Sequence, residues 1–65
     1  ATQAQRQQVL ALHIARLPER ERACLVLRDL EGLSSPEVAA ILGITEETVR
    51  TAIYRAKEKL KQWMS

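Results

Sequence analysis

The sequence predicts an all-α protein: a four-helix domain with a C-terminal helix-turn-helix. Strong helix formers (Ala, Leu, Glu, Arg, Lys and Gln) dominate its 65 residues, and only two Gly and two Pro interrupt them. Apolar residues recur at three- and four-residue steps, as on a helix, and no stretch of the sequence alternates as a strand does. A chain of this length has room for one small core. We therefore expect residues 1–65 to form a single domain.

The first predicted helix runs from about Thr2 to Arg16. Thr2 has a side chain that caps helix N-termini well. The residue before a proline avoids the α region, so Pro18 should end this helix near Arg16 or Leu17. Its apolar stripe consists of Val9, Leu10, His13 and Ile14. We expect Trp63 and Met64, at the other end of the chain, to pack across this helix.

The second predicted helix lies between Pro18 and Gly32, where glycine favours a left-handed stop. The single cysteine, Cys24, is expected to be a small buried or half-buried apolar residue and not a reactive thiol. The apolar stripe of this helix consists of Ala23, Val26, Leu27 and Leu30.

The third predicted helix is short and closes at Gly43. Ser34 and Glu37 have the spacing of a capping box. Ser35 as the cap, with Pro36 at the first helical position, is the alternative. The residues expected to face inward are Val38, Ala39 and Leu42.

The fourth predicted helix begins after Thr45, a good N-cap, and could run to Gln62 or Trp63. Glu46 and Glu47 lie in its first turn, where a carboxylate complements the helix dipole. The residues expected to close the core are Val49, Ile53, Ala56 and Leu60.

The third and fourth helices have the spacing of a helix-turn-helix. Ala39 is small where the two helices would cross, and Gly43 stands four residues later, where the chain must turn. Ile44 would fill the turn, and Val49 would lock the second helix against the first. A structural helical hairpin without DNA contacts is the alternative that these residues leave open.

Positive charge gathers in the last helix. The net charge is only +2, yet residues 50–61 hold five Lys or Arg and one acid, which suits a polyanionic partner. Arg50 and Tyr54 are four residues apart, as are Thr51 and Arg55, so the four share an outward face. Such side chains suit a major groove, where Arg bonds guanine and Tyr meets thymine methyl groups. The three lysines suit phosphate contact or simple solubility.

Several function classes find no support in the sequence. It offers no nucleophile–base pair, no carboxylate pair in a cleft and no phosphate-binding glycine loop, so we expect no enzyme, cofactor or small-molecule substrate. It has no Cys/His cluster for a metal, and no apolar run long enough for a membrane span. The lone Cys24 excludes an intramolecular disulfide and suits a reducing cytoplasm. The chain starts at Ala1, so we expect a fragment of a longer protein.

The motifs together resemble region 4 of bacterial sigma factors, most of all the extracytoplasmic-function (ECF) group. The resemblance covers residues 17–60 almost without a gap, and residues 2–16 fit the preceding helix of the family. The segments that carry it are "LPERER", "LRDLEGLS", "EVAAILGI" and "TVRTAIYRAKEKL". An output domain of a response regulator shares part of this rhythm and is a rival, but the first and last segments favour the sigma factor.

The resemblance implies binding of the promoter −35 element in the major groove, and docking on the β flap of RNA polymerase. The DNA-binding residues that it implies are Thr45, Glu46, Glu47, Arg50, Thr51, Tyr54, Arg55 and Lys57. It also implies an apolar cleft for the flap helix or an anti-sigma factor, with candidate residues Leu17, Val26, Leu30 and Leu33, although each of them would equally suit an ordinary core. A rival within the family is a sigma-like domain that binds an anti-sigma factor and never touches DNA.

The sequence departs from the family pattern at two places. Many relatives carry a basic residue at the position of Ala52, so we expect one phosphate contact to be absent. The pair Glu46 and Glu47 also replaces small or apolar residues. Both departures predict weak DNA binding by the domain alone, with much of the affinity contributed by the polymerase and by a −10-reading domain through effective concentration.

Overall fold

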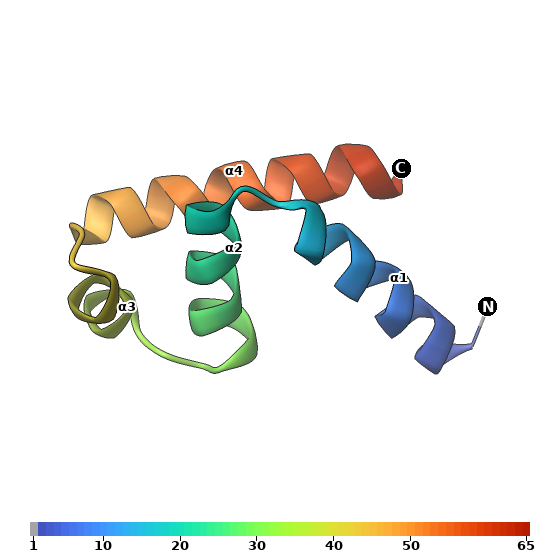
Figure 1. Ribbon diagram of the computed structural model, residues 1–65, viewed down its shortest axis with the longest axis horizontal. Coiled ribbons are helices and arrows are strands. Elements are labelled where there is room, and N and C mark those ends of the chain that lie inside the picture. The colour runs from blue at the N-terminus through green and yellow to red at the C-terminus, as the bar shows by residue number, and fades with distance from the viewer. Residues whose placement is uncertain (1) are drawn as a thin grey trace.

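The computed structural model describes residues 2–65, which form helices and connecting turns without any strand. This confirms the predicted all-α class. Figure 1 shows the order of the elements along the chain. They are α1 (Gln3–Arg16), α2 (Glu19–Leu25), the π-helix η1 (Val26–Leu30), α3 (Ser35–Leu42) and α4 (Glu46–Met64).

Helix α4 is the longest element, and helices α1, α2 and α3 all pack against it. At 19 residues it is about 28 Å long. Helix α3 packs against its N-terminal part and α2 against its middle, whereas α1 meets only its C-terminal end and then diverges from it (Figure 1). The domain is therefore a compact three-helix body with α1 as an arm.

The core consists of two small clusters. The larger joins α2, α3 and α4 through Cys24, Val38, Ala39, Val49 and Ala52. The smaller joins the α1–α2 link to the middle of α4 through Leu17, Leu25 and Ala56. Cys24 is fully buried, as predicted. Of the residues predicted to close the core from α4, Val49 and Ala56 are buried, and Ile53 and Leu60 are half-buried against the clusters.

The helix caps are those that the sequence predicts. Thr2 and Ser34 each begin a helix with a capping box, and Ser34 exchanges bonds with Glu37: the Ser34 hydroxyl oxygen accepts from the Glu37 N–H, and the Glu37 carboxylate accepts from the Ser34 N–H. Ser34 is thus the cap of α3, and the alternative with Ser35 is wrong. This bonding lowers the pKa of the Glu37 carboxyl. Thr45 caps α4, accepting from the Thr48 N–H at 3.1 Å.

The second predicted helix differs from expectation after Leu25. The chain changes there from an α-helix to a π-helix, and the Glu31 N–H donates to the Val26 carbonyl, five residues back, at 2.9 Å. The wider turn shifts the later residues out of the 3.6-residue register. Leu30, which belongs to the predicted apolar stripe and is also a candidate for the partner cleft, is therefore 63% exposed. Gly32 ends the element with a positive φ of 75°, as predicted.

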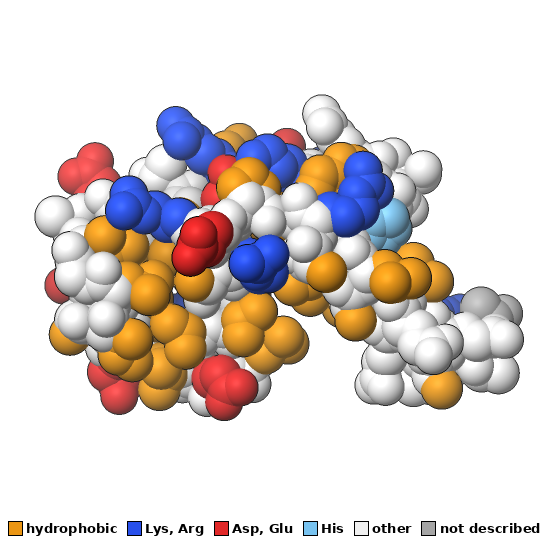
Figure 2. All heavy atoms as spheres, viewed as in Figure 1, with side chains coloured by type: hydrophobic (Ala, Val, Ile, Leu, Met, Phe, Trp, Pro, Cys, Tyr) orange, Lys and Arg blue, Asp and Glu red, His pale blue; other side chains and the backbone are white. Residues whose placement is uncertain are grey.

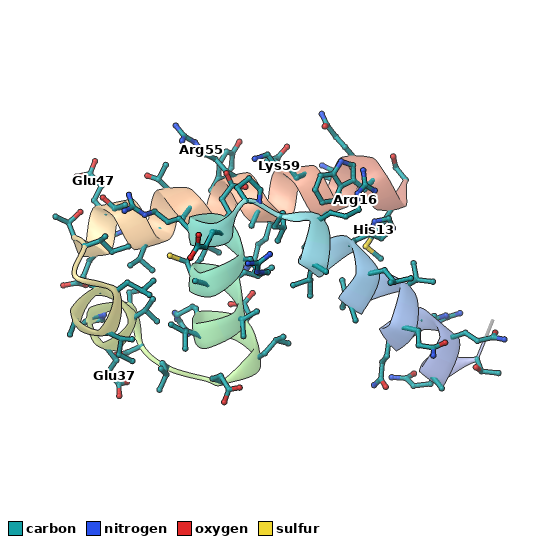
Figure 3. All side chains as sticks on the ribbon, in the orientation of Figure 1. His13, Arg16, Glu37, Glu47, Arg55 and Lys59 are labelled. Carbon is teal, nitrogen blue, oxygen red and sulfur yellow. The ribbon has the colours of Figure 1, made fainter. Side chains whose placement is uncertain are left out.

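The apolar stripe of α1 is covered only at its C-terminal end. No residue of α1 is buried, and Leu12 is 68% exposed. The arm is held where the His13 ring lies 6.1 Å from the Trp63 ring and the Arg16 guanidinium lies 4.3 Å from its centroid. Figure 3 shows His13 and Arg16 beside the C-terminal end of α4. The predicted packing of Trp63 across α1 is confirmed, while Met64 is half exposed.

Candidate nucleic-acid interface

The turn between α3 and α4 has the geometry of a helix-turn-helix. Gly43 adopts the left-handed conformation, with φ of 68°, and the next N–H, from Ile44, donates to the Ala39 carbonyl at 3.0 Å. Ile44 packs against the larger core cluster, and Val49 is fully buried beneath it. The roles predicted for Ala39, Gly43, Ile44 and Val49 are all confirmed. The second helix of the motif is thereby fixed with one face free.

The free face of α4 carries the four predicted readers. Val49, Ala52 and Ala56 face inward, and side chains on the opposite side of the helix point into solvent. Tyr54 is 66% exposed. The exposed readers are Arg50, Thr51, Tyr54 and Arg55. Figure 2 shows Lys and Arg side chains spread along α4, with apolar side chains gathered below them.

Two shallow grooves divide these readers into two pairs. Thr51 and Arg55 line a groove between α4 and the N-terminal end of α2, together with Glu47 and Arg20. Figure 3 shows Glu47 and Arg55 pointing away from α3.

Arg50 and Tyr54 line a second groove, between α4 and the π-helix, together with Arg28 and Lys57. The outward face is therefore a ridge with a groove on each side, and each groove is lined in part by basic side chains. A helix in a DNA groove would present both sides of this ridge at once.

Arg20 is a functional candidate that sequence reasoning missed. It lies in α2, 35 residues before Arg55 in the chain, yet both residues line the same groove. Arg20 stands in the run "ERER", and neither a periodic pattern nor a motif in the sequence distinguishes it from the other charged residues there. Only the packing of α2 on α4 brings it to the interface.

Ion pairs occupy three of the five basic side chains of α4. The Arg50 guanidinium lies 3.8 Å from the Glu46 carboxylate. The Lys57 ammonium lies 3.2 Å from Asp29 of η1, and the Lys59 ammonium lies 2.8 Å from Glu21 of α2. The residues that the structure describes give Arg55 and Lys61 no acidic partner within ion-pair distance. These two are the basic side chains of α4 most available to phosphate.

Three predicted site residues have a structural task of their own. Lys57 holds Asp29, so its ammonium is only in part available to DNA. The Thr45 hydroxyl caps α4 and also lies 2.8 Å from the Thr48 hydroxyl. Glu46 pairs with Arg50 within α4. Glu47, in contrast, is exposed and lines the groove with Arg55.

The interpretation of Ala52 as a lost phosphate contact is wrong. Ala52 is 5% exposed and belongs to the larger core cluster with Cys24 and Ala39. Its side chain forms part of the floor of the groove lined by Arg20 and Arg55. The small side chain is therefore a packing requirement, because it lets α2 approach α4 closely.

The four predicted partner residues do not form one surface. Leu17 is buried in the smaller core cluster, which agrees with the ordinary-core alternative that the sequence left open for it. Val26 and Leu33 are half-buried, and Leu33 packs on the larger cluster. Leu30 alone is open. It lines an apolar groove between α1, η1 and α4, together with Leu10, Ile14, Leu25 and Leu60.

Two further kinds of candidate site among residues 2–65 are a metal site and a reactive thiol at Cys24. Residues 2–65 contain no group of three or more His, Cys, Asp or Glu side chains that could hold a metal ion. Burial raises the pKa of the Cys24 thiol, although the nearby Arg20 charge acts in the opposite direction. The thiol is therefore protonated and inert at neutral pH. None of the described helices is both long enough and apolar enough to span a membrane.

The sequence of this chain is similar to a known protein family and to several curated proteins. Residues 7–60 match the family model described as Sigma-70, region 4. The ECF RNA polymerase sigma factor SigE of Mycolicibacterium smegmatis is 43% identical over 49 residues, which are 75% of this chain and 19% of that protein. The ECF RNA polymerase sigma-E factors of Escherichia coli (strain K12) and Salmonella typhimurium (strain LT2) are each 43% identical over 53 residues, 82% of this chain and 28% of theirs. The chain thus spans less than a third of the length of these relatives.

Proposed function

Because the chain belongs to the Sigma-70 region 4 family and its relatives are ECF sigma factors, we propose that it recognises the promoter −35 element during transcription initiation. The observation that carries the proposal is the free face of α4. The second helix of a helix-turn-helix keeps Arg50, Thr51, Tyr54 and Arg55 exposed while its other face is locked in the core. A major groove of about 12 Å width admits one such helix.

In the proposed complex the N-terminal half of α4 enters the major groove. Arg50 donates two hydrogen bonds to guanine O6 and N7, and Tyr54 packs its ring on a thymine methyl group or a sugar. Glu47 accepts from the amino group of a cytosine. These contacts read sequence because each base pair presents a distinct pattern of donors and acceptors in this groove.

In this complex the basic side chains that flank the ridge contact the DNA phosphates. Arg20 and Arg55 line one groove from two different helices, so together they bracket one DNA strand. Lys61, further along α4, is available for the same purpose. Such contacts fix the position of the domain on the duplex and make the affinity depend on salt.

The apolar groove around Leu30 is proposed to receive the β flap of RNA polymerase. It is lined almost wholly by leucine and isoleucine side chains from α1, η1 and α4, with the Lys57–Asp29 ion pair at its edge. An amphipathic helix fits such a groove, because it buries an apolar face and leaves its polar face in water. An anti-sigma factor would compete for the same surface.

Selection of duplex DNA from a randomised pool by this chain tests the DNA-binding proposal. We expect enrichment of one short motif at low salt, and an affinity for it that falls steeply as salt rises, because each neutralised phosphate releases counterions. Because the domain alone is expected to bind weakly, the selection is repeated with the full-length protein in RNA polymerase holoenzyme, and a pool that stays random in both selections would sink the proposal. It would leave the rival in which the domain binds only an anti-sigma factor.

Capture of core RNA polymerase on the immobilised chain tests the flap proposal separately. We expect retention of the polymerase, and release when a peptide with the sequence of the flap helix is added in excess. Retention that the peptide does not reverse would place the contact elsewhere on the polymerase.

A further inference from the structure

We propose that Glu46 is a positioning residue that makes Arg50 selective for a base over phosphate. The inference rests on the proposed function, because it concerns how Arg50 reads DNA. The observation behind it is the ion pair between the two side chains, 3.8 Å apart on the free face of α4. Neither side chain is confined by packing: the Arg50 side chain is 63% exposed and that of Glu46 is 49% exposed.

The pair has the stabilising order along the helix. Glu46 lies one turn before Arg50, and an acidic residue four positions before a basic one is the better arrangement, since it also agrees with the helix dipole. The carboxylate draws the guanidinium toward the N-terminal end of α4. That end is the part of a recognition helix that meets base edges.

A free arginine at this position has two competing partners on DNA. Phosphate attracts it on any sequence, whereas guanine offers a bidentate site only at the right base pair. The Glu46 carboxylate carries the same charge as phosphate and is itself repelled by it. Moving Arg50 to a phosphate breaks the pair, whereas a guanine at the floor of the groove can be met from the side on which Glu46 holds the guanidinium.

The charges around the pair support this division of roles. Arg50 lines its groove with Arg28 and Lys57. Lys57 is held by Asp29, and Arg28 donates to the Leu33 carbonyl at 3.2 Å. All three basic side chains of this groove are therefore engaged within the protein. The groove on the other side of the ridge has Arg20 and Arg55, which no ion pair among residues 2–65 engages.

The test is a double-mutant cycle of Glu46→Gln and Arg50→Ala, with Glu58→Gln as the control. Glu58 is an exposed acid on the same helix, three turns away, so its replacement removes the same charge without touching Arg50. For each variant, affinities are measured for the selected duplex and for a scrambled one over a range of salt concentrations. Circular dichroism confirms that each variant is folded.

We expect Glu46→Gln to lower the ratio of the affinity for selected DNA to the affinity for scrambled DNA about twofold. This factor corresponds to the interaction free energy of an exposed ion pair at this spacing. On scrambled DNA its salt dependence should steepen by about one phosphate contact. In the Arg50→Ala background, Glu46→Gln should leave the ratio unchanged, and Glu58→Gln should leave it unchanged in either background.

An equal loss of the ratio with and without Arg50 would mean that Glu46 contacts DNA directly, and this would overturn the inference. An unchanged ratio in Glu46→Gln, when Arg50→Ala does lower it, would overturn it as well. If Arg50→Ala itself leaves the base preference intact, the base-reading role of Arg50 in the proposed function fails instead.

Discussion

The Lys59 ammonium donates to both carboxylate oxygens of Glu21, at 2.8 and 2.9 Å, across the contact between α4 and α2. The two residues are 38 positions apart in the chain. The Glu21 side chain is only 13% exposed, so water competes little for its carboxylate. The pair therefore fixes how α2 lies on α4, and with it the distance between Arg20 and Arg55 across their shared groove.

Loss of this ion pair should destabilise the domain. Lys59→Met keeps the stem of the side chain but leaves the Glu21 carboxylate shielded and without its partner. We expect the free energy of unfolding to fall by about 1–2 kcal/mol, between the values for exposed and buried pairs. Urea unfolding followed by circular dichroism measures it. Lys61→Met is the matched control, because Lys61 has no ion pair in the described chain, and a loss as large as that of Lys59→Met would contradict this account.

The basic residues of α4 should differ in their effect on DNA binding. Arg55→Ala should weaken binding to all duplexes alike and reduce the salt slope by about 0.9, the value for one phosphate contact. Lys57→Ala should change the slope less, since Asp29 already holds the Lys57 ammonium. Fluorescence anisotropy at several salt concentrations compares the two variants. A larger change for Lys57→Ala would mean that DNA displaces Asp29.

Leu30 should matter for the polymerase and not for the fold. Its side chain is 63% exposed and lines the apolar groove, so Leu30→Ala should weaken capture of core polymerase about fivefold or more while leaving the unfolding midpoint unchanged. Leu12→Ala is the control: Leu12, in α1, is about as exposed as Leu30 but lines a different groove. Equal losses for the two variants would indicate a contact spread along the arm.

Gly43 should resist replacement because of its backbone alone. A Cβ added there meets no atom within 4 Å, so space is not the constraint, but φ is +68°. Gly43→Ala should cost about 1–2 kcal/mol, the penalty of the left-handed conformation for an L-residue. Gly43→Asn should cost less, because asparagine tolerates this region better. The thermal unfolding midpoints of the two variants measure these costs. Equal losses of stability in both would point to a cause other than backbone strain.

Local features of the fold could be predicted from the sequence because their causes are local. A cap needs one hydroxyl and an N–H two or three residues later, so the caps Thr2, Ser34 and Thr45 can be recognised from the sequence. The helix-turn-helix follows likewise from the sizes of Ala39 and Gly43 and the spacing between them. The free face of α4 then follows from its buried face.

Three features could not be predicted, for different reasons. A π-helix leaves no period of its own in a short apolar stretch, so the change of register that exposes Leu30 could not be read from the sequence. An apolar stripe shows which face of α1 avoids water but not whether another element covers it. The contacts of Arg20 and Glu21 with the groove and with Lys59 join distant segments, and nothing in the sequence pairs one particular acid with one particular base.

The contact of α1 with Trp63 gives the domain an intrinsic fluorescence probe for the attachment of α1. Trp63 is the single tryptophan of the chain, and its ring meets His13 and Arg16 at the junction of α1 with α4. Its fluorescence therefore follows the attachment of the arm, whereas circular dichroism follows all the helices together. One titration with denaturant, or with a partner that binds the arm, can thus separate release of α1 from melting of the helix-turn-helix without any added label.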